Sequence, residues 1–218
     1  MFYCRERELR DLNKRYNRGE FECIVIYGRR RVGKTALINE FCKDKPTIFF
    51  SALNASEQEN LEAFSKAICE KEHPGTDLAP VYPSFDAALT KITQMAENER
   101  LVLVIDEYPY LAKASKSISS RLQHIIDHTW KNGQLFLILC GSSMSFMEYQ
   151  VLGYESPLYG RCTGQFKIQA LSYKEIREFN PTLKTDQQAF VYGITGGIPH
   201  YINRSEEHTS ELQSLRHL

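Results

Sequence analysis

The sequence lacks several features that would assign it to other classes of protein. Basic and acidic residues balance at 27 each, so no net charge favours nucleic acid or an anionic membrane. No apolar run approaches the roughly 18 residues of a membrane-spanning helix, and the N-terminus has no hydrophobic signal core. We therefore expect a cytoplasmic protein with no membrane partner.

Cysteine pairs at metal-binding spacing are also lacking. The six cysteines form no CxxC pair, and the six histidines show no metal spacing. Several cysteines lie inside apolar runs, such as Cys23 in ECIVIY and Cys140 in FLILCG. This pattern is typical of buried free thiols in a reducing compartment and argues against a disulfide framework or a zinc site.

What is present describes one globular α/β domain. Of the 218 residues, 42% are apolar and 25% charged, which are ordinary values for a folded protein. Short apolar runs alternate with helical periods, a pattern typical of parallel strands covered on both faces. We predict a five-stranded parallel sheet between helices, with strands at residues 23–27, 47–52, 101–106, 135–140 and 165–170.

Beyond the last predicted strand the pattern becomes helical. SYKE (Ser172, Glu175) and TDQQ (Thr185, Gln188) both resemble capping boxes, which begin helices. We therefore divide the chain into a core at 1–170 and the start of a helical lid at 171–203.

The last segment, RSEEHTSELQSLRHL at 204–218, has no apolar period, cap or turn logic. Its first eleven residues resemble the translation of a common sequencing-adapter oligonucleotide. We expect this tail to be non-native and the chain to be the front of a longer protein. The alternative is a genuine polar tail.

The most informative motif is GRRRVGKT, which fits G-x-x-x-x-G-K-[ST] between a predicted strand and a predicted helix. Its backbone would wrap a phosphate, Lys34 would reach the β and γ phosphates, and Thr35 would ligate magnesium. The alternative is a glycine turn with an incidental lysine. The predicted phosphate-binding residues are Gly28, Arg29, Arg30, Arg31, Val32, Gly33, Lys34, Thr35 and Ala36.

The three arginines occupy the variable positions of this loop, where side chains usually point away from phosphate. We expect Arg29, Arg30 and Arg31 to be solvated or paired with carboxylates.

An acidic pair ends the strand LVLVID. Asp106 would stand at the carboxyl end of the strand, where it can hold the magnesium shell, and Glu107 could polarise the attacking water. Acidic pairs after strands also serve as plain helix N-caps.

A third strand, LFLILC, ends in Ser142 and Ser143 and is expected to lie between the other two motif strands. One of these hydroxyls could contact the γ-phosphate or the water. The alternative is a simple strand-to-helix turn.

Together these blocks, with FYCRERELRDLNKRY, PLYGRCTGQFKIQALSYKE and TGGIPHYI, resemble the prokaryotic archaeal-type ATPases of the AAA+/STAND group, over residues 1–203. The resemblance implies a P-loop NTPase core of the additional-strand type, a helical lid, and ATP and Mg²⁺ as cofactors. It also implies a C-terminal winged-helix or nuclease-like region in the complete protein.

The resemblance further assigns five positions. Arg5 and Glu6 would belong to the block that flanks the adenine, and Gly197 and Pro199 to the glycine-proline motif of the lid, where the proline would pack against the base. Arg161 would face a γ-phosphate, in this chain or in a neighbouring subunit; the alternative is a salt-bridged surface arginine. Cys4 departs from the family, which has glycine or asparagine at this position.

Three functions follow as hypotheses. The first is a regulatory ATPase module that binds Mg-ATP and hydrolyses it through Glu107. The second is a nucleotide-dependent switch or interaction module with negligible turnover. The third, a GTPase or small-molecule kinase, is disfavoured because no N-K-x-D guanine motif is present. Partners beyond ATP and ADP would be further copies of the chain, or DNA or protein reached through the C-terminal region.

Overall fold

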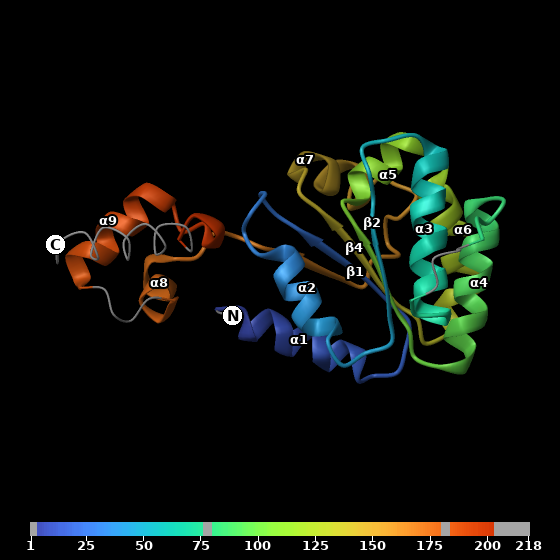
Figure 1. Cartoon of the computed structure of the whole chain (residues 1–218), viewed down its shortest axis with the longest axis horizontal. Coiled ribbons are helices and arrows are strands. Elements are labelled where there is room, and N and C mark those ends of the chain that lie inside the picture. Colours follow the sequence, from blue (N-terminus) through green and yellow to red (C-terminus); the bar gives the residue numbers. More distant parts are fainter. Residues whose placement is uncertain (1–3, 76–79, 180–183, 203–218) are drawn as a thin grey trace.

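The computed structural model describes residues 4–75, 80–179 and 184–202 (Figure 1). The predicted tail at 204–218 and residue 203 therefore lie outside the described residues. Within the described part of the chain, no helix is long and apolar enough to cross a membrane.

Five parallel strands form the sheet, in the order β2-β3-β4-β1-β5. This confirms the predicted fold class and the placement of β4 between the two other motif strands. The strands are β1 (Glu22–Tyr27), β2 (Thr47–Ser51), β3 (Val102–Asp106), β4 (Phe136–Gly141) and β5 (Gly164–Lys167). Every residue of β1, β3 and β4 is buried, as expected for central strands with both faces covered.

The last strand is shorter than the predicted 165–170. The amide of Ile168 still donates to the Tyr27 carbonyl, but the carbonyl of Gln169 turns to accept a hydrogen bond from the Arg5 guanidinium. A contact from the far end of the chain therefore ends β5 early, which local pattern does not reveal.

Helices cover both faces of the sheet (Figure 1). Alternate residues of each strand face opposite layers, so Cys23, Val25 and Leu137 pack in one cluster while Ile24, Ile26 and Ile138 pack in the other. The helices are α1 (Glu6–Tyr16), α2 (Lys34–Cys42), α3 (Glu57–Glu72), α4 (Phe85–Asn98), α5 (Tyr108–Ala114), α6 (Ile118–His128), α7 (Met144–Phe146), α8 (Tyr173–Phe179) and α9 (Thr185–Thr195), with a 3₁₀ turn η1 (Trp130–Asn132) and a π-helical turn η2 (Met147–Val151).

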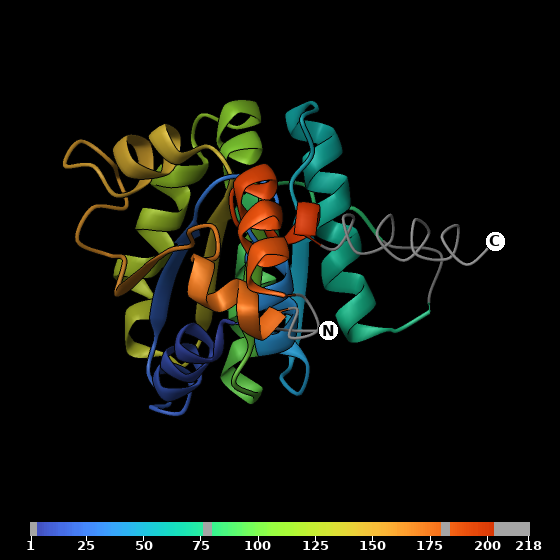
Figure 2. The ribbon, with the colours of Figure 1, turned by 90° about the vertical axis from the view of Figure 1, so that its left-hand side faces the viewer.

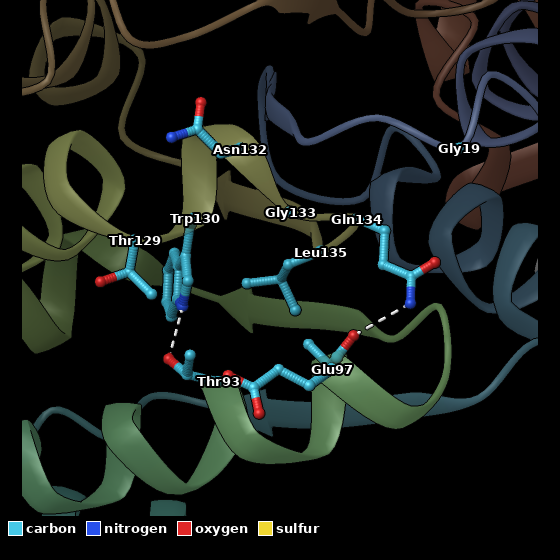
Figure 3. Close-up of a pocket in the computed structure, with 10 residues that line it drawn as sticks. Gly19, Thr93, Glu97, Thr129, Trp130, Asn132, Gly133, Gln134 and Leu135 are labelled. Carbon is cyan, nitrogen blue, oxygen red and sulfur yellow. Dashed lines mark hydrogen bonds between the residues drawn. The ribbon is translucent and has the colours of Figure 1, made fainter.

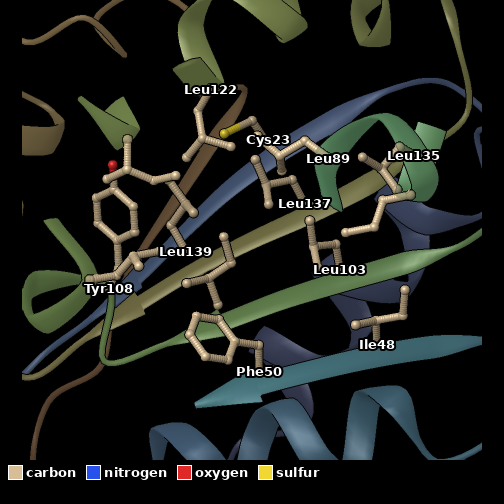
Figure 4. Packing of buried hydrophobic residues seen from close by; sticks show 14 of the residues in the cluster. Cys23, Ile48, Phe50, Leu89, Leu103, Tyr108, Leu122, Leu135, Leu137 and Leu139 are labelled. Atoms are coloured by element: carbon tan, nitrogen blue, oxygen red, sulfur yellow. The ribbon is translucent and has the colours of Figure 1, made fainter. Parts of the chain in front are cut away.

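The larger cluster lies between the sheet and α3, α4, α5 and α6 (Figure 4). Leu61, Phe64, Leu89 and Leu122 supply its helical side. The smaller cluster joins the opposite face to Leu12 of α1 and to Leu37, Ile38 and Phe41 of α2. The loop that follows β1 therefore runs from a buried central strand to a helix that packs on the smaller cluster.

The segment after β5 forms α8 and α9, which stand apart from the sheet on the side of α2 and lie in front of it in Figure 2. Ser172 and Glu175 form the predicted capping interaction, with the Ser172 amide donating to the Glu175 carboxylate at 2.7 Å. The second predicted capping pair is wrong by one position. Helix α9 begins at Thr185 with Lys184 as N-cap, and Gln187 accepts from the Lys184 amide.

A third apolar cluster joins this segment to the N-terminus, through Cys4, Leu171, Ile176 and Ile202. Cys4 adopts a φ of 59°, in the left-handed region that glycine and asparagine enter most readily. This backbone requirement explains why glycine or asparagine is expected at that position. None of the six cysteines forms a disulfide; Cys42 and Cys162 are half-buried, whereas we predicted buried thiols.

Candidate functional site

The loop between β1 and α2 is shaped by a close backbone approach at its first residue. Gly28 has a φ of 154°, and a Cβ at this position would lie 2.1 Å from the carbonyl oxygen of Ile168. No other residue fits there without displacing the chain after β5. Gly33 then forms the N-cap of α2, so the loop ends at a helix N-terminus whose amides face the loop.

Lys34, the first residue of α2, is buried and its ammonium group lies across the loop. The Nζ atom donates to the carbonyl oxygens of Gly28 at 3.0 Å and Arg29 at 2.9 Å. It also donates to the Ser142 Oγ at 3.3 Å. A buried cation is thus held at the mouth of the loop by neutral acceptors, which an anion would outcompete.

A second contact in the site joins the side chains of Thr35 and Asp106. The Thr35 hydroxyl donates to Asp106 Oδ2 at 3.2 Å, and Asp106 Oδ1 accepts from the Glu107 amide at 2.9 Å. Both groups are oxygen ligands of the kind that Mg²⁺ prefers, and one carboxylate beside a hydroxyl suits an ion that takes its other ligands from water and phosphate. No group of three metal-ligating side chains occurs among the described residues.

Glu107 adopts a left-handed backbone conformation, with φ 49° and ψ 42°. Few residues other than glycine, asparagine and aspartate take this conformation, so the position is strained. Its carboxylate accepts from the Ser142 hydroxyl at 2.5 Å and from the Ser142 amide at 3.4 Å. Ser142 therefore links Glu107 to Lys34.

The structure separates the two candidate serines, which the sequence could not do. Ser142 ends the β4 turn within hydrogen-bond distance of both Lys34 and Glu107. Ser143 is exposed at the start of α7, where its side chain makes no capping hydrogen bond. Of the pair, Ser142 alone is brought to the other predicted residues.

The buried thiol of Cys140, in β4, lies beside Asp106. Burial raises the pKa of Cys140 far above its ordinary range, and the negative charge of Asp106 raises it further. The thiol therefore stays neutral and adds no charge to the site.

The three loop arginines are exposed, as the expectation of solvation has it, and two of them also contact tyrosines. Arg30 donates to the Tyr110 hydroxyl of α5 at 2.6 Å, and Arg31 donates to the Tyr201 hydroxyl at 2.9 Å. The Arg31 guanidinium also lies 5.3 Å from the Tyr201 ring centroid. The loop thus bridges the core and the segment after α9.

A cavity of about 590 Å³ lies at this end of the sheet. Pro199 and His200, in the segment after α9, both line it. Sequence reasoning missed His200, Tyr110 and Tyr201, because nothing local indicates that a tyrosine will reach a loop 170 residues away. The wall is completed by Arg30, Arg31, Gly33, Lys34, Thr35, Ala36, Glu107, Tyr110 and Ser142.

Pro199 is positioned by a second close backbone approach. A Cβ on Gly197 would lie 2.0 Å from the carbonyl oxygen of Leu171, and the Leu171 amide donates to the Gly197 carbonyl at 2.7 Å. Glycine at this position lets the chain after α9 cross the chain after β5.

Arg5 lies beside the loop, with its side chain engaged by the backbone. Its guanidinium donates to the carbonyl oxygen of Val32 at 3.3 Å and to that of Gln169. Arg5 therefore connects the loop to the chain after β5, and it does not line the cavity described above.

Arg161 is not brought to the other predicted residues. It forms two hydrogen bonds to Asp127 at the end of α6, at 2.9 and 2.6 Å. Nearby, the Thr163 amide donates to Cys23 near the start of β1, while the loop follows Tyr27 at its other end, about 13 Å along the strand. Arg161 thus lies toward the opposite end of the strands, near the start of β1.

A second cavity, of about 500 Å³, also lies at that opposite end, near the starts of β1 and β4 (Figure 3). Trp130 donates to the Thr93 hydroxyl at 2.8 Å, and the Gln134 amide donates to the Ala96 carbonyl at 3.1 Å. These bonds tie α4 to the chain before β4. The cavity contains none of the predicted functional residues.

Comparison with known proteins agrees with this geometry. Residues 2–204 match the family described as an ATPase domain predominantly from Archaea. A Methanocaldococcus jannaschii protein described as uncharacterized is 37% identical over 204 residues, which cover 94% of this chain and 44% of that protein. The chain therefore spans less than half the length of this relative.

Two solved structures are similar in fold. A Walker-type ATPase of Pyrococcus abyssi has a TM-score of 0.68 at 20% identity, covering 99% of this chain and 76% of that chain. The Aeropyrum pernix ORC1 protein, solved in complex with DNA, has a TM-score of 0.69 at 17% identity, covering 99% and 62%. At these identities the likeness concerns the fold.

Proposed function

This chain belongs to the family of ATPase domains found predominantly in Archaea, and we propose that it binds Mg-ATP in the cavity after β1 and hydrolyses it to ADP and phosphate. The observation that carries the proposal is the connected set formed by Lys34, Ser142 and Glu107, beside Thr35 and Asp106. Cation, hydroxyl and carboxylate meet at the carboxyl ends of β3 and β4, where ligands bind in open parallel sheets.

Phosphate binding would begin at the loop. Its backbone amides and the N-terminus of α2 favour an anion, and the Lys34 ammonium is already buried there without a carboxylate partner among its hydrogen bonds. When phosphate enters, Lys34 exchanges the carbonyl oxygens of Gly28 and Arg29 for charged oxygens, which form stronger hydrogen bonds.

Thr35 and Asp106 would hold Mg²⁺, which when bound neutralises charge that develops on the transferred phosphoryl group. Their direct hydrogen bond of 3.2 Å brings the two oxygens to one point of the site. The Asp106 carboxylate is further oriented by the Glu107 amide.

Hydrolysis would use Glu107 as the base. The oxygen of a water molecule attacks the γ-phosphorus, the bond to the ADP oxygen breaks, and the Glu107 carboxylate takes the proton from the water. Because the carboxylate is bonded to Ser142 in this structure, it must turn from that hydroxyl to meet the water. The Ser142 hydroxyl is then free to donate to phosphate.

The runner-up function is a nucleotide-dependent switch with negligible turnover, within a regulatory protein of the STAND type. The contact of Arg31 with Tyr201 favours it, since the loop and the lid would close together on a retained nucleotide. ADP that remains bound through purification would support this function, and rapid multiple turnovers would exclude it.

Partners beyond nucleotide also belong to the proposal. An action of Arg161 on a γ-phosphate would require a second copy of the chain, because in its own subunit the residue pairs with Asp127. The balanced charge of the chain supplies no broad basic surface for DNA. A DNA or protein partner would therefore be reached through the region that longer relatives possess.

The test compares two lysines, Lys34 at the start of α2 and Lys45 just after its end. Lys34→Ala is expected to abolish binding of a fluorescent ATP analogue, because the loop loses its only buried ammonium among the described residues. Lys45→Ala is the matched control, since Lys45 also donates to a backbone carbonyl, that of Phe41, but lies beyond the other end of the helix. Equal binding by wild type and a folded Lys34→Ala protein would contradict the proposal.

A further inference from the structure

Two cysteines that the proposed function does not use have their sulfur atoms close together. Cys23 Sγ and Cys162 Sγ are 4.0 Å apart, although 139 residues separate them in the sequence. Thr163 fixes the two backbones side by side: its amide donates to the Cys23 carbonyl at 2.8 Å, and its hydroxyl accepts from the Cys23 amide at 3.0 Å. The approach of the two thiols is therefore a consequence of the pairing between β1 and β5.

The two thiols differ in their access to solvent. Cys23 is completely buried in the larger core cluster, where Figure 4 shows it on β1 beside Leu122. Cys162 is half-buried and lines a cavity of about 300 Å³, together with Tyr159 and Gln165. A small reagent can thus reach Cys162, whereas Cys23 is closed to solvent.

The hydrogen bond between the two thiols gives them different acidities. The Cys23 thiol donates to the Cys162 sulfur, and this bond lowers the pKa of Cys162 while raising that of Cys23. By contrast, burial raises the pKa of Cys42, the other half-buried cysteine. Since the thiolate is the reactive form, Cys162 is the more reactive of the two accessible thiols.

We propose that Cys162 and Cys23 are a redox-sensitive pair, in which Cys162 reacts with a hydroperoxide and Cys23 then closes an intramolecular disulfide. The Cys162 thiolate attacks the peroxide oxygen, the O–O bond breaks, and a sulfenic acid forms. The Cys23 sulfur then attacks the Cys162 sulfur, the S–O bond breaks, and water leaves. With hydrogen peroxide, two thiols and one peroxide give one disulfide and two waters.

The geometry suits this reaction. A disulfide requires sulfur atoms about 2.05 Å apart, so the pair must approach by about 2 Å from its present distance. The link would join β1 to the chain entering β5, near the start of β1 and away from the phosphate loop at its end. Oxidation is therefore expected to stabilise the fold and to leave nucleotide binding unchanged.

The experiment treats the reduced full chain with one equivalent of hydrogen peroxide, followed by intact mass and peptide mapping. We expect the loss of two hydrogen atoms, a peptide that links residues 23 and 162, and a higher unfolding temperature that falls back on reduction. Cys42→Ser, the control with matched exposure, should form the same link. A disulfide between other cysteines, or oxidation that leaves Cys162 unmodified, would overturn the proposal.

Two further measurements assign the roles within the pair. Cys162→Ser should lose the link, while Cys23→Ala should retain a Cys162 sulfenic acid that dimedone traps. If the buried Cys23→Ala substitution prevents folding, alkylation rates in the wild-type protein decide the matter. Iodoacetamide should modify Cys162 faster than Cys42 at neutral pH, and the reverse order would contradict the assignment.

Discussion

The Ser142 hydroxyl donates a hydrogen bond of 2.5 Å to the Glu107 carboxylate. Because Ser142 also accepts a bond from Lys34, this contact joins the phosphate loop to the acidic end of β3. A single hydroxyl therefore relates the group that would bind phosphate to the group that would activate water.

Ser142→Ala is expected to lower the rate of ATP hydrolysis by about 10²-fold, as for other lost donors that face developing charge. Nucleotide affinity should change little, because the loop and Lys34 remain. The measurement is steady-state phosphate release at saturating ATP. The neighbouring Ser143→Ala is the matched control, since Ser143 is exposed and should keep the wild-type rate; a larger loss in Ser143→Ala would reverse the assignment.

The choice between these serines shows where sequence reasoning stops. The alternation of apolar runs and the G-x-x-x-x-G-K-T spacing predicted the sheet and the loop, because these depend on local periodicity and backbone requirements. Of the strand order, only the place of β4 between the two other motif strands was expected. Which of two adjacent hydroxyls turns inward depends on the geometry of the turn after β4, and adjacent residues of one type carry no signal about it.

The same limit applies to the segment after α9. Roles for Gly197 and Pro199 were expected from a resemblance and Arg30 and Arg31 are exposed as expected, but their tyrosine partners were not predicted. Tyr110 and Tyr201 come from elements far from the loop in sequence, and only the tertiary packing of α5 and the segment after α9 brings their hydroxyls to it.

Tyr201→Phe tests the contact between the segment after α9 and the loop. The substitution removes the hydroxyl that accepts from Arg31 but retains the ring, so we expect loss of about 0.5–1 kcal/mol of contact energy. Dissociation of ADP, followed by stopped-flow fluorescence, should accelerate about two- to fivefold. Faster release in Tyr201→Ala than in Tyr201→Phe would show the contribution of the ring; an unchanged rate in both would refute the coupling.

Gly28→Ala is expected to destabilise the fold more than Gly19→Ala. Both glycines have positive φ, but a Cβ at Gly19 meets nothing within 4 Å, whereas at Gly28 it lies 2.1 Å from the Ile168 carbonyl oxygen. Gly19→Ala should therefore lower the free energy of unfolding by about 1 kcal/mol, the cost of a left-handed backbone conformation for alanine. Gly28→Ala should lower it by clearly more. Urea unfolding of the two variants gives the comparison, and equal losses would contradict the close approach.

The ion pair between Asp127 and Arg161 predicts a small dependence of stability on pH. The hydrogen bond from Arg161 lowers the pKa of Asp127 from its ordinary 3.8. A carboxyl group whose pKa is lower in the folded protein stabilises the fold at pH values above its pKa in the unfolded chain. This contribution is lost as the pH falls through the pKa of the folded protein. At this exposure we expect at most about 1 kcal/mol.

The readout is the free energy of unfolding from pH 7 to pH 3, measured for wild type and for Arg161→Gln. The variant should be slightly less stable at pH 7 and the two should converge at low pH. In dilute protein its ATP turnover should equal that of wild type. A turnover deficit that appears only at concentrations where copies associate would assign Arg161 to a neighbouring site.

The most direct test of the central claim is ATP turnover by Glu107→Gln, with nucleotide binding measured on the same sample. Glutamine keeps the size of the side chain and can still bond to Ser142, but it cannot take a proton from water. We predict that binding persists and that turnover falls by about 10²- to 10⁴-fold. Undiminished turnover, in a protein whose Lys34→Ala variant no longer binds nucleotide, would show that Glu107 does not activate the water.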